Sequence, residues 1–330
     1  MPETTVSPAA ARISVVIPAY NAAGFITDAL DSIARQTLPP VQVVVVNDGS
    51  KDATSQVIRD WMAHNTTAFT VCLHDQTNSG ISATRNQGIR LATGDWIAFL
   101  DADDIWEPFH LATLVAALAL VPSAIAAYGA GRLFAGDVPN ERLYDDFWGN
   151  PSKKFGMPIA GTACYRIDAT IFPRLVKGNF IKPSSLVVAR AAIDTVGVFN
   201  ESLGTAEDRE FLVRLVLLGD FVYTSESITR YRWHDDNASQ IKNAQRNAAN
   251  GLRAIQMVRD NPALHLSPAN RAACLAEMQA CAKDYMYLCC QKGWRDYREG
   301  LAFIRQLSGW GGALRVLHPK HIARSLLKRS

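Results

Sequence analysis

The first half of the chain alternates between short apolar runs and longer segments with a helical hydrophobic period. Three uncharged apolar runs, at residues 13–18, 43–46 and 97–100, are rich in Val and Ile or Phe and Leu. Such runs are typical of strands buried on both faces of a parallel sheet. Between the first two runs, apolar residues follow the spacing of a helix that packs one face on a sheet: Ile26, Ala29, Leu30, Ile33 and Ala34.

The alternation of strand and helix predicts a doubly wound α/β domain with a mostly parallel, Rossmann-like sheet and right-handed crossovers. Further strands are expected at residues 69–73, 124–128, 185–189, 221–224 and 228–231. Further helices are expected around Val57 to Met62, from Leu111 to Val121, and from Gly204 to Leu215. Residues 137–178 show no regular period and are interpreted as a long irregular segment.

The two ends of the chain differ from this pattern. Residues 1–12 contain two prolines and Glu3 and have no apolar core, so we expect a disordered tail and no signal peptide. After residue 236 the pattern becomes helical, and Ser267 followed by Pro268 predicts a helix start. We therefore divide the chain into a tail (1–12), an α/β domain (13–236) and a C-terminal helical appendage (237–330).

Composition narrows the class of protein. The 330 residues carry a net charge of +3 with 20% charged residues, which favours neither nucleic-acid binding nor disorder. The six cysteines form no C-x-x-C pair, so a zinc site or a disulfide framework is unsupported and a cytoplasmic location is expected. The uncharged stretch 111–129 is long enough to cross a bilayer, but Pro122 interrupts it, which favours a buried helix followed by a strand.

Three carboxylates follow the run at residues 97–100: Asp101, Asp103 and Asp104. Because carboxylates packed this closely repel one another, a hard cation such as Mg²⁺ or Mn²⁺ would stabilise them. Ligands bind at the carboxyl ends of the strands in such sheets, where Tyr20 and Asp48 are also expected. The alternative is a solvated loop of helix-capping aspartates.

A glycine cluster at Gly129, Gly131 and Gly136 is partly similar to a dinucleotide-binding fingerprint. The third glycine of that fingerprint is misplaced and no helical pattern follows, so we do not expect an NAD site.

Two further positions have both a structural and a functional interpretation. Glu207 and Asp208 lie in the first turn of a predicted helix, where they either complement the helix dipole or include a carboxylate that acts as a base. His234 follows a predicted strand and is either structural or a metal ligand.

The motifs taken together resemble one family, the GT-A type inverting glycosyltransferases of family 2. The resemblance extends from Ile13 to about His234 and depends on the order of the motifs, since each alone is weak. They are Ile17-Pro18-Ala19-Tyr20-Asn21, Val46-Asn47-Asp48-Gly49-Ser50, Asn78-Ser79-Gly80 with Arg85-Asn86, Leu100-Asp101-Ala102-Asp103-Asp104, Glu207-Asp208, and Tyr231-Arg232-Trp233-His234.

The resemblance implies a set of donor-binding residues. Pro18 and Tyr20 would line the nucleotide pocket, and Asp48 would accept a hydrogen bond from the base. Arg85 would lie near the base or the diphosphate, and Asp101 near the ribose. The donor implied is a nucleotide-diphosphate sugar, most simply a UDP-sugar, because Asp48 and Arg85 match the family's uracil-side positions.

The resemblance also implies the catalytic and metal residues. Asp103 would bind the Mn²⁺ or Mg²⁺ that bridges the diphosphate, with help from His234, and Asp208 would be the catalytic base. A metal stabilises the leaving diphosphate, and a base on the opposite face of the sugar activates an acceptor hydroxyl, so direct displacement inverts the anomeric centre. The Q-x-x-R-W motif of processive members is absent, which implies a hexosyltransferase-type enzyme that moves one sugar per encounter.

The acceptor is the open part of this assignment. A saccharide or lipid-linked acceptor in bacterial cell-surface polysaccharide or glycolipid assembly would suit the family, and residues 137–178 either form part of the acceptor wall or are a surface excursion. The basic, amphipathic segment 315–329 is either a solvated helix end or a contact with the inner face of the cytoplasmic membrane.

Two alternatives come from other classes. A sugar-nucleotidyltransferase would also use acidic metal ligands, but its glycine-rich basic phosphate loop is missing. A non-catalytic nucleotide-sugar binding or assembly protein would not need to retain both Asp103 and Asp208.

Overall fold

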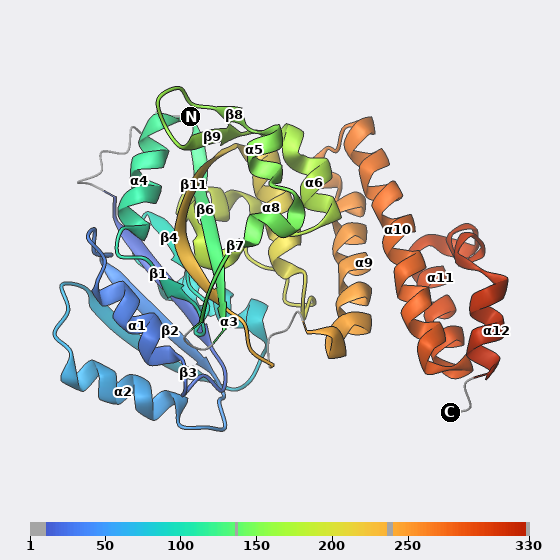
Figure 1. Ribbon diagram of the computed structural model, residues 1–330, viewed down its shortest axis with the longest axis horizontal. Coiled ribbons are helices and arrows are strands. Elements are labelled where there is room, and N and C mark those ends of the chain that lie inside the picture. The colour runs from blue at the N-terminus through green and yellow to red at the C-terminus, as the bar shows by residue number, and fades with distance from the viewer. Residues whose placement is uncertain (1–10, 136–137, 236–239, 328–330) are drawn as a thin grey trace.

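The computed structural model describes residues 11–135, 138–235 and 240–327, drawn in colour in Figure 1. Most of the predicted tail, residues 1–10, lies outside the described residues. The α/β part and a series of C-terminal helices form an elongated molecule, with helices α9 to α12 extending away from the sheet (Figure 1).

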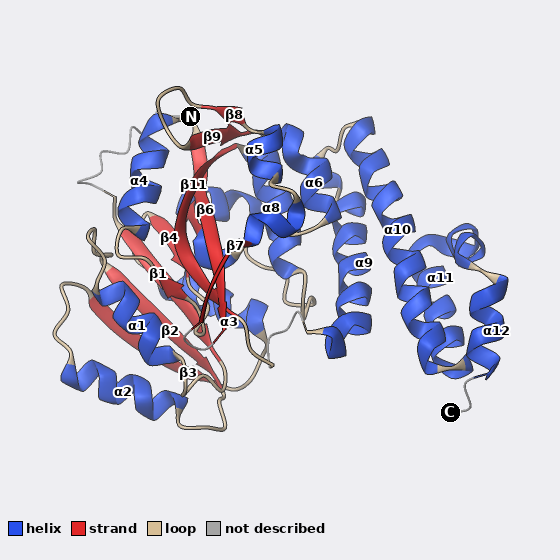
Figure 2. Cartoon of the chain, viewed as in Figure 1, coloured by secondary structure: helices blue, strands red, loops and turns tan. Residues whose placement is uncertain are grey.

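One large mixed sheet runs through the α/β part (Figure 2). Strands β1 to β4 are parallel to one another in the order β3-β2-β1-β4, and the short antiparallel strand β10 joins β4 to β6. The full order is β3-β2-β1-β4-β10-β6-β11-β9-β8, with β5 and β7 pairing to the side. The bounds are β1 (Ile13–Ala19), β2 (Gln42–Asp48), β3 (Thr70–Gln76), β4 (Trp96–Phe99), β5 (Ile105–Trp106), β6 (Ala124–Ala135), β7 (Val138–Leu143), β8 (Met157–Pro158), β9 (Cys164–Ile167), β10 (Leu186–Ala189) and β11 (Asp220–Arg232).

Helices cover both faces of this sheet, and the alternation of side chains along β1 shows why. Val15 and Ile17 point into the apolar layer under α1, α2 and α4, whereas Val16 points into the layer under α3, α6 and α8. The helix bounds are α1 (Ile26–Ala34), α2 (Thr54–His64), α3 (Ile81–Leu91), α4 (His110–Leu120), α5 (Pro151–Phe155), α6 (Phe172–Lys177), α7 (Arg190–Val196) and α8 (Glu207–Leu218). The predicted α/β fold with a mostly parallel sheet is confirmed.

Three details of the sequence analysis need correction. Residues 137–178 are not irregular, because they contain β7, β8, β9, α5 and α6. The two closing strands expected at 221–224 and 228–231 are one long strand, β11, whose register against β6 shifts near Thr224 and Ser227. Ala34, placed on the buried face of its helix, is exposed.

The glycine cluster has a packing role in β6. A Cβ at Gly129 would lie 2.5 Å from the side chain of Ile228, and one at Gly131 would lie 2.2 Å from the ring of Tyr231. Both glycines therefore allow β11 side chains to approach the backbone of β6. No helix follows Gly131, because β6 continues to Ala135.

The C-terminal region is helical, as expected, and consists in its described part of α9 (Ala244–Asp260), α10 (Pro268–Lys292), α11 (Trp294–Val316) and α12 (Pro319–Leu327). The Ser267 hydroxyl accepts a hydrogen bond from the Asn270 N–H and caps α10. Ile255 and Met278 join the core of the α/β part, while Tyr285 and Met286 belong to a separate cluster with α11. Across the described ranges, no helix combines the length and apolar character needed to span a bilayer.

Candidate active site

A cleft of about 990 Å³ opens at the carboxyl ends of β1 and β4 and is closed on its other sides by α8, α9 and the loop after β11. Seven of the eight residues singled out in the sequence line this cleft: Pro18, Tyr20, Arg85, Asp101, Asp103, Asp208 and His234. These residues are spread over more than 200 positions of sequence, so the fold brings them together. Parallel strands that end at one edge of the sheet explain the convergence.

Asp48, the eighth residue, is not among the cleft's lining residues. Its buried carboxylate accepts hydrogen bonds from the backbone N–H groups of Ser79 and Gly80 and from the side chain of Gln76. These contacts hold the loop before α3 against the end of β2. The base-recognition role that the resemblance gave to Asp48 stays a prediction.

Asp103 and His234 are in direct contact in the lining of the cleft. The Nε2 atom of His234 lies 2.9 Å from an Oδ2 oxygen of Asp103, and the imidazole ring stacks on Phe25 at 4.9 Å. Burial and the neighbouring Asp101 raise the pKa of Asp103. A carboxylate and an imidazole side by side in a partly buried cleft can both serve as ligands of a divalent cation.

Asp104 points away from the cleft and anchors the acidic loop. One of its oxygens accepts from the Ser184 hydroxyl at 2.6 Å, and the other accepts from the backbone N–H of Arg232. The Arg232 guanidinium donates in turn to the backbone carbonyl of Asp103 at 2.9 Å. The loop that carries Asp101 and Asp103 is thus fixed by β11 and by the turn before β10.

Arg85 joins the acidic loop to the start of α8. Its buried guanidinium donates from Nη2 to Asp101 at 2.8 Å and from Nη1 to Glu207 at 2.6 Å. Because the guanidinium is planar and rigid, donating to two carboxylates at once fixes the orientation of both. Arg85 therefore contacts the residue predicted near the ribose, and it also contacts the neighbour of the predicted base.

Glu207 and Asp208 have different surroundings, although they are adjacent. Glu207 is buried against Arg85, and burial and Asp208 raise its pKa to about 7 against the opposing effect of Arg85. Asp208 is half-buried, lines the cleft and accepts hydrogen bonds from the Asn179 side chain and the Arg209 backbone N–H. Only Asp208 of the two is placed to meet a molecule in the cleft without breaking an ion pair.

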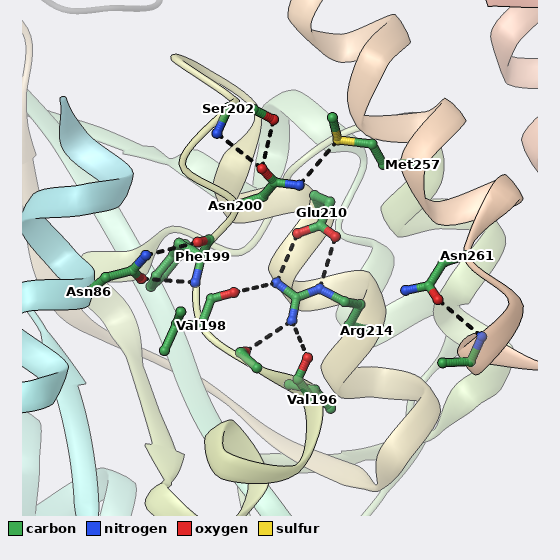
Figure 3. A network of polar contacts seen from close by, with 12 residues as sticks. Asn86, Val196, Val198, Phe199, Asn200, Ser202, Glu210, Arg214, Met257 and Asn261 are labelled. Carbon is green, nitrogen blue, oxygen red and sulfur yellow. Dashed lines mark hydrogen bonds and ion pairs between the residues drawn. The ribbon is translucent and has the colours of Figure 1, made fainter. Parts of the chain in front are cut away.

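The loop before α8 is held by a polar network (Figure 3). The buried Arg214 guanidinium pairs with Glu210 and donates to the carbonyls of Val196, Gly197 and Val198. Asn86 both donates to the carbonyl of Phe199 and accepts from its N–H. These hydrogen bonds fix the segment that ends in Ala206. Ala206, directly before Glu207, has a left-handed backbone with φ 64°.

Sequence reasoning missed several residues of the cleft. Lys182 lies over the Tyr144 ring at 4.9 Å, and although burial alone lowers its pKa, Tyr144 and Asp208 raise it above the ordinary value. Trp148 and Lys177 also line the cleft, so the segment 137–178 forms one of its walls. The sequence offered two interpretations of residues 137–178, part of an acceptor wall or a surface excursion, and the lining of the cleft by Tyr144 and Trp148 agrees with a wall.

Comparison with known proteins places this geometry in a family. The family described as "Glycosyl transferase family 2" matches residues 14–170. An uncharacterized glycosyltransferase of Rickettsia typhi is 23% identical over 71% of this chain and 67% of its own length. Glycosyltransferase GlyA of Streptococcus pneumoniae is 27% identical over 70% of this chain but only 32% of its own length.

Solved structures share the fold over most of the chain. S. aureus TarS 1–349 in complex with UDP-GlcNAc is similar with a TM-score of 0.65 and 20% identity, covering 90% of this chain and 81% of TarS 1–349. The mannosyltransferase PcManGT from Pyrobaculum calidifontis, in complex with GDP-Man and Mn²⁺, has a TM-score of 0.57 at 19% identity, covering 96% of this chain and 89% of its own. Residues 14–170 therefore form a glycosyl transferase family 2 domain, and the chain as a whole has the GT-A fold.

Proposed function

We propose that this glycosyltransferase moves a sugar from a UDP-sugar to an acceptor hydroxyl, with a divalent metal and with inversion at the anomeric carbon. The single observation that carries the proposal is the placement of Asp103 with His234 and of Asp208 along one cleft. Similar folds bind UDP-GlcNAc in TarS and GDP-Man with Mn²⁺ in PcManGT. The uridine base is proposed because Asp48 and Arg85 match the family's uracil-side positions.

Asp103 and His234 would hold the Mn²⁺ or Mg²⁺. The part of the chain that the structure describes has no group of three His, Cys, Asp or Glu side chains arranged around a cation. A two-donor protein site suits a metal whose other ligands are substrate phosphate oxygens and water. When bound, the cation would neutralise the charge that develops on the departing diphosphate.

Asp208 would accept the proton of the acceptor hydroxyl. Asn179 donates to one of its oxygens, and the adjacent backbone N–H of Arg209 donates to the other, which orients the carboxylate in the cleft. A carboxylate oriented in this way is positioned to take the proton of a hydroxyl bound in the cleft. Attack from this side would displace the diphosphate directly and invert the sugar.

Arg85 and Asp101 would fix the donor side of the cleft. Asp101 is held by Arg85 at 2.8 Å and keeps 31% of its side chain exposed, so it can still accept from a ribose hydroxyl. Pro18 lies near the end of β1 and Tyr20 directly follows this strand, both residues line the cleft, and Tyr20 is 48% exposed. A planar base would find an exposed aromatic face there.

The acceptor would lie against the wall formed by residues 137–178 and the start of α9. Tyr144 and Trp148 provide aromatic faces, and Lys177 and Lys182 provide cations. Aromatic faces suit the apolar sides of sugar rings, which supports a saccharide or lipid-linked acceptor. We keep residues 13–236 as the catalytic domain and 237–330 as a helical appendage that supplies Arg246 and Asn247 to the cleft.

A donor screen tests this function. Thermal unfolding is measured with UDP-, GDP- and dTDP-sugars, each with Mn²⁺, with Mg²⁺ and with EDTA. We expect a UDP-sugar to raise Tm only when a divalent ion is present. If a UDP-sugar raised Tm equally in EDTA, the metal role would be contradicted. If GDP-sugars raised Tm more than UDP-sugars, the nucleotide of the donor would be guanosine diphosphate instead of uridine diphosphate.

We extend the proposal to a peripheral contact with the inner face of the cytoplasmic membrane through the end of the chain. In α12, Leu326 and Leu327 are 58% and 84% exposed, close to the basic Arg324. Exposed leucines beside cations suit an anionic lipid surface. Leu326→Ser with Leu327→Ser should reduce co-sedimentation with anionic vesicles, whereas Leu120→Ser, at an exposed site in α4, should not. Equal partitioning of all three proteins would exclude this anchor.

A further inference from the structure

A second cavity, of about 530 Å³, lies in the helical appendage between α9, α10 and α11. Helix α9 separates it from the catalytic cleft, because Arg246, Asn247 and Gly251 line the cleft while Leu252 and Arg259 line the cavity. The volume is within the range of small-molecule sites. No residue of this cavity has a role in the proposed transfer.

The cavity is lined by both apolar and polar side chains, and the buried part of the lining is mainly apolar. Its lining includes Leu252, Met278, Ala282, Ile304 and Val316, all at most 5% exposed. Leu275, which is 44% exposed, brings an apolar side chain to the same hollow from the solvent side. An aliphatic chain would bury its surface here at a gain of roughly 25 cal/mol per Å².

The shape of the cavity depends on a break in α11 at Gly309. The backbone there has φ 67° and ψ −174°, which is left-handed and non-helical, and Gly309 and Gly312 both line the hollow. Only glycine adopts such a conformation without strain. The break therefore lies at the cavity, where two glycines present backbone in place of larger side chains.

Three cations line the cavity: Arg259, Lys283 and Arg315. Arg259 is already compensated by Asp260, at 2.6 Å. Lys283 and Arg315 are exposed, and neither forms an ion pair with any carboxylate of the described chain. An apolar interior with two uncompensated cations complements a ligand with an aliphatic chain and an anionic end.

We propose that this cavity binds an amphiphilic anion, an aliphatic chain ending in a phosphate or carboxylate, with the chain among the apolar residues and the anion at Lys283 and Arg315. This inference goes beyond the proposed transfer reaction, because the site lies on the other side of α9 from the cleft. Binding at this site therefore depends neither on the sugar donor nor on the role of Asp208.

Calorimetric titration of the full chain tests the proposal with four probes: decyl phosphate and decanoate below their critical micelle concentrations, decanol below its solubility limit, and inorganic phosphate. We expect decyl phosphate or decanoate to bind once per chain, decanol to bind at least about tenfold more weakly, and inorganic phosphate not to bind. The stronger of the two anions identifies the headgroup. If decanol bound as tightly as the anions, the role of the two cations would be wrong. If neither decyl phosphate nor decanoate bound, the proposed site would be wrong.

Two variants locate the binding. Lys283→Ala with Arg315→Ala should weaken binding of the anion by about tenfold or more, since both side chains are exposed and their removal spares the core. Arg298→Ala, a change at an exposed arginine of α11 outside the cavity, should leave the affinity unchanged. Ala282→Met should reduce the affinity for every probe by filling the hollow. An unchanged affinity in the double variant would contradict the proposal even if Ala282→Met failed to fold.

Saturating UDP with Mn²⁺ separates this site from the catalytic cleft. If the anion binds in the appendage, its affinity is the same with and without UDP. Displacement of decyl phosphate by UDP would assign the anion to the cleft and overturn the second site, while leaving the proposed transfer function intact.

Discussion

Arg85 and Glu207, which are 122 positions apart in sequence, form a buried ion pair with 2.6 Å between Nη1 of the arginine and Oε1 of the glutamate. The same guanidinium holds Asp101, so one side chain connects the acidic loop after β4 to the first turn of α8. The geometry of the donor side and the position of Asp208 therefore depend on a single residue of α3.

Arg85→Lys should weaken both donor binding and stability. A lysine keeps the charge but cannot donate to two carboxylates in a fixed fork, so Asp101 or Glu207 loses its partner. We expect the free energy of unfolding to fall by roughly 2–4 kcal/mol, because an uncompensated carboxylate stays buried. Arg90→Lys, at an exposed arginine of the same helix, is the control and should behave as wild type in urea unfolding and donor titration. A double-mutant cycle with Glu207→Gln that shows no coupling would contradict the bridge.

Asp103→Asn should abolish the dependence of donor binding on the metal. The amide keeps the shape of the side chain and removes the charge that attracts the cation. Donor titrations with and without Mn²⁺ should show a large difference for the wild type and little or none for Asp103→Asn, and His234→Gln should give an intermediate result. Asp60→Asn, at an exposed site on α2, serves as the control for a lost surface charge. Wild-type metal dependence in Asp103→Asn would remove Asp103 from the metal site.

Asp208→Asn should reduce the transfer rate by about a hundredfold to ten-thousandfold, which is the usual cost of losing a general base. Donor affinity should change little, because the proposed function gives the donor to Asp101 and Asp103, whereas Asp208 contacts Asn179 and Arg209. Glu207→Gln should retain transfer at reduced stability, since the amide oxygen still accepts from Arg85. If Glu207→Gln were inactive and Asp208→Asn were active, the base would be Glu207. Activity in both variants would contradict the proposed inverting mechanism.

The parts of the site that the sequence predicted are those where a local pattern carries the chemistry. Asp101 and Asp103 follow a buried strand, and Asp208 lies in the first turn of a helix, so their positions are predictable from the local sequence alone. The orientation of a side chain is different, because it depends on distant contacts. Asp48 turns to the backbone of Ser79 and Gly80, which no spacing in the sequence indicates.

The fold was predictable in its first half for a related reason. Strands β1, β2 and β4 are buried on both faces and contain continuous apolar runs, whereas β8 has only two residues. Met157 and Pro158 of β8 are exposed, so this edge strand has no hydrophobic period to recognise. The pairing of β8 with β9 uses backbone hydrogen bonds that no side-chain pattern indicates, and the sequence of residues 137–178 therefore shows no regular period.

Asp145 should make the stability of the protein depend on pH. Burial and the neighbouring Asp146 raise its pKa to about 6, although the Tyr223 hydroxyl, which donates to it at 2.6 Å, acts in the opposite direction. An aspartate in an unfolded chain has a pKa of about 4. The folded state therefore binds this proton more tightly, and the stabilisation it gives is complete below pH 4 and is lost as the pH rises through 6.

Asp145→Asn removes this titration and keeps an oxygen that accepts from Tyr223. The difference in unfolding free energy between the variant and the wild type should therefore shift by roughly 2–3 kcal/mol in favour of the variant between pH 4 and pH 7. Urea unfolding at steps of half a pH unit measures it, and other titrating groups cancel in the difference. Asp146→Asn, at the exposed neighbouring position, should show a much smaller change. A difference between Asp145→Asn and wild type that stays constant from pH 4 to pH 7 would show that folding does not raise the pKa of Asp145, and the effect of burial would then be offset by the bond from Tyr223 and by other groups that favour the carboxylate.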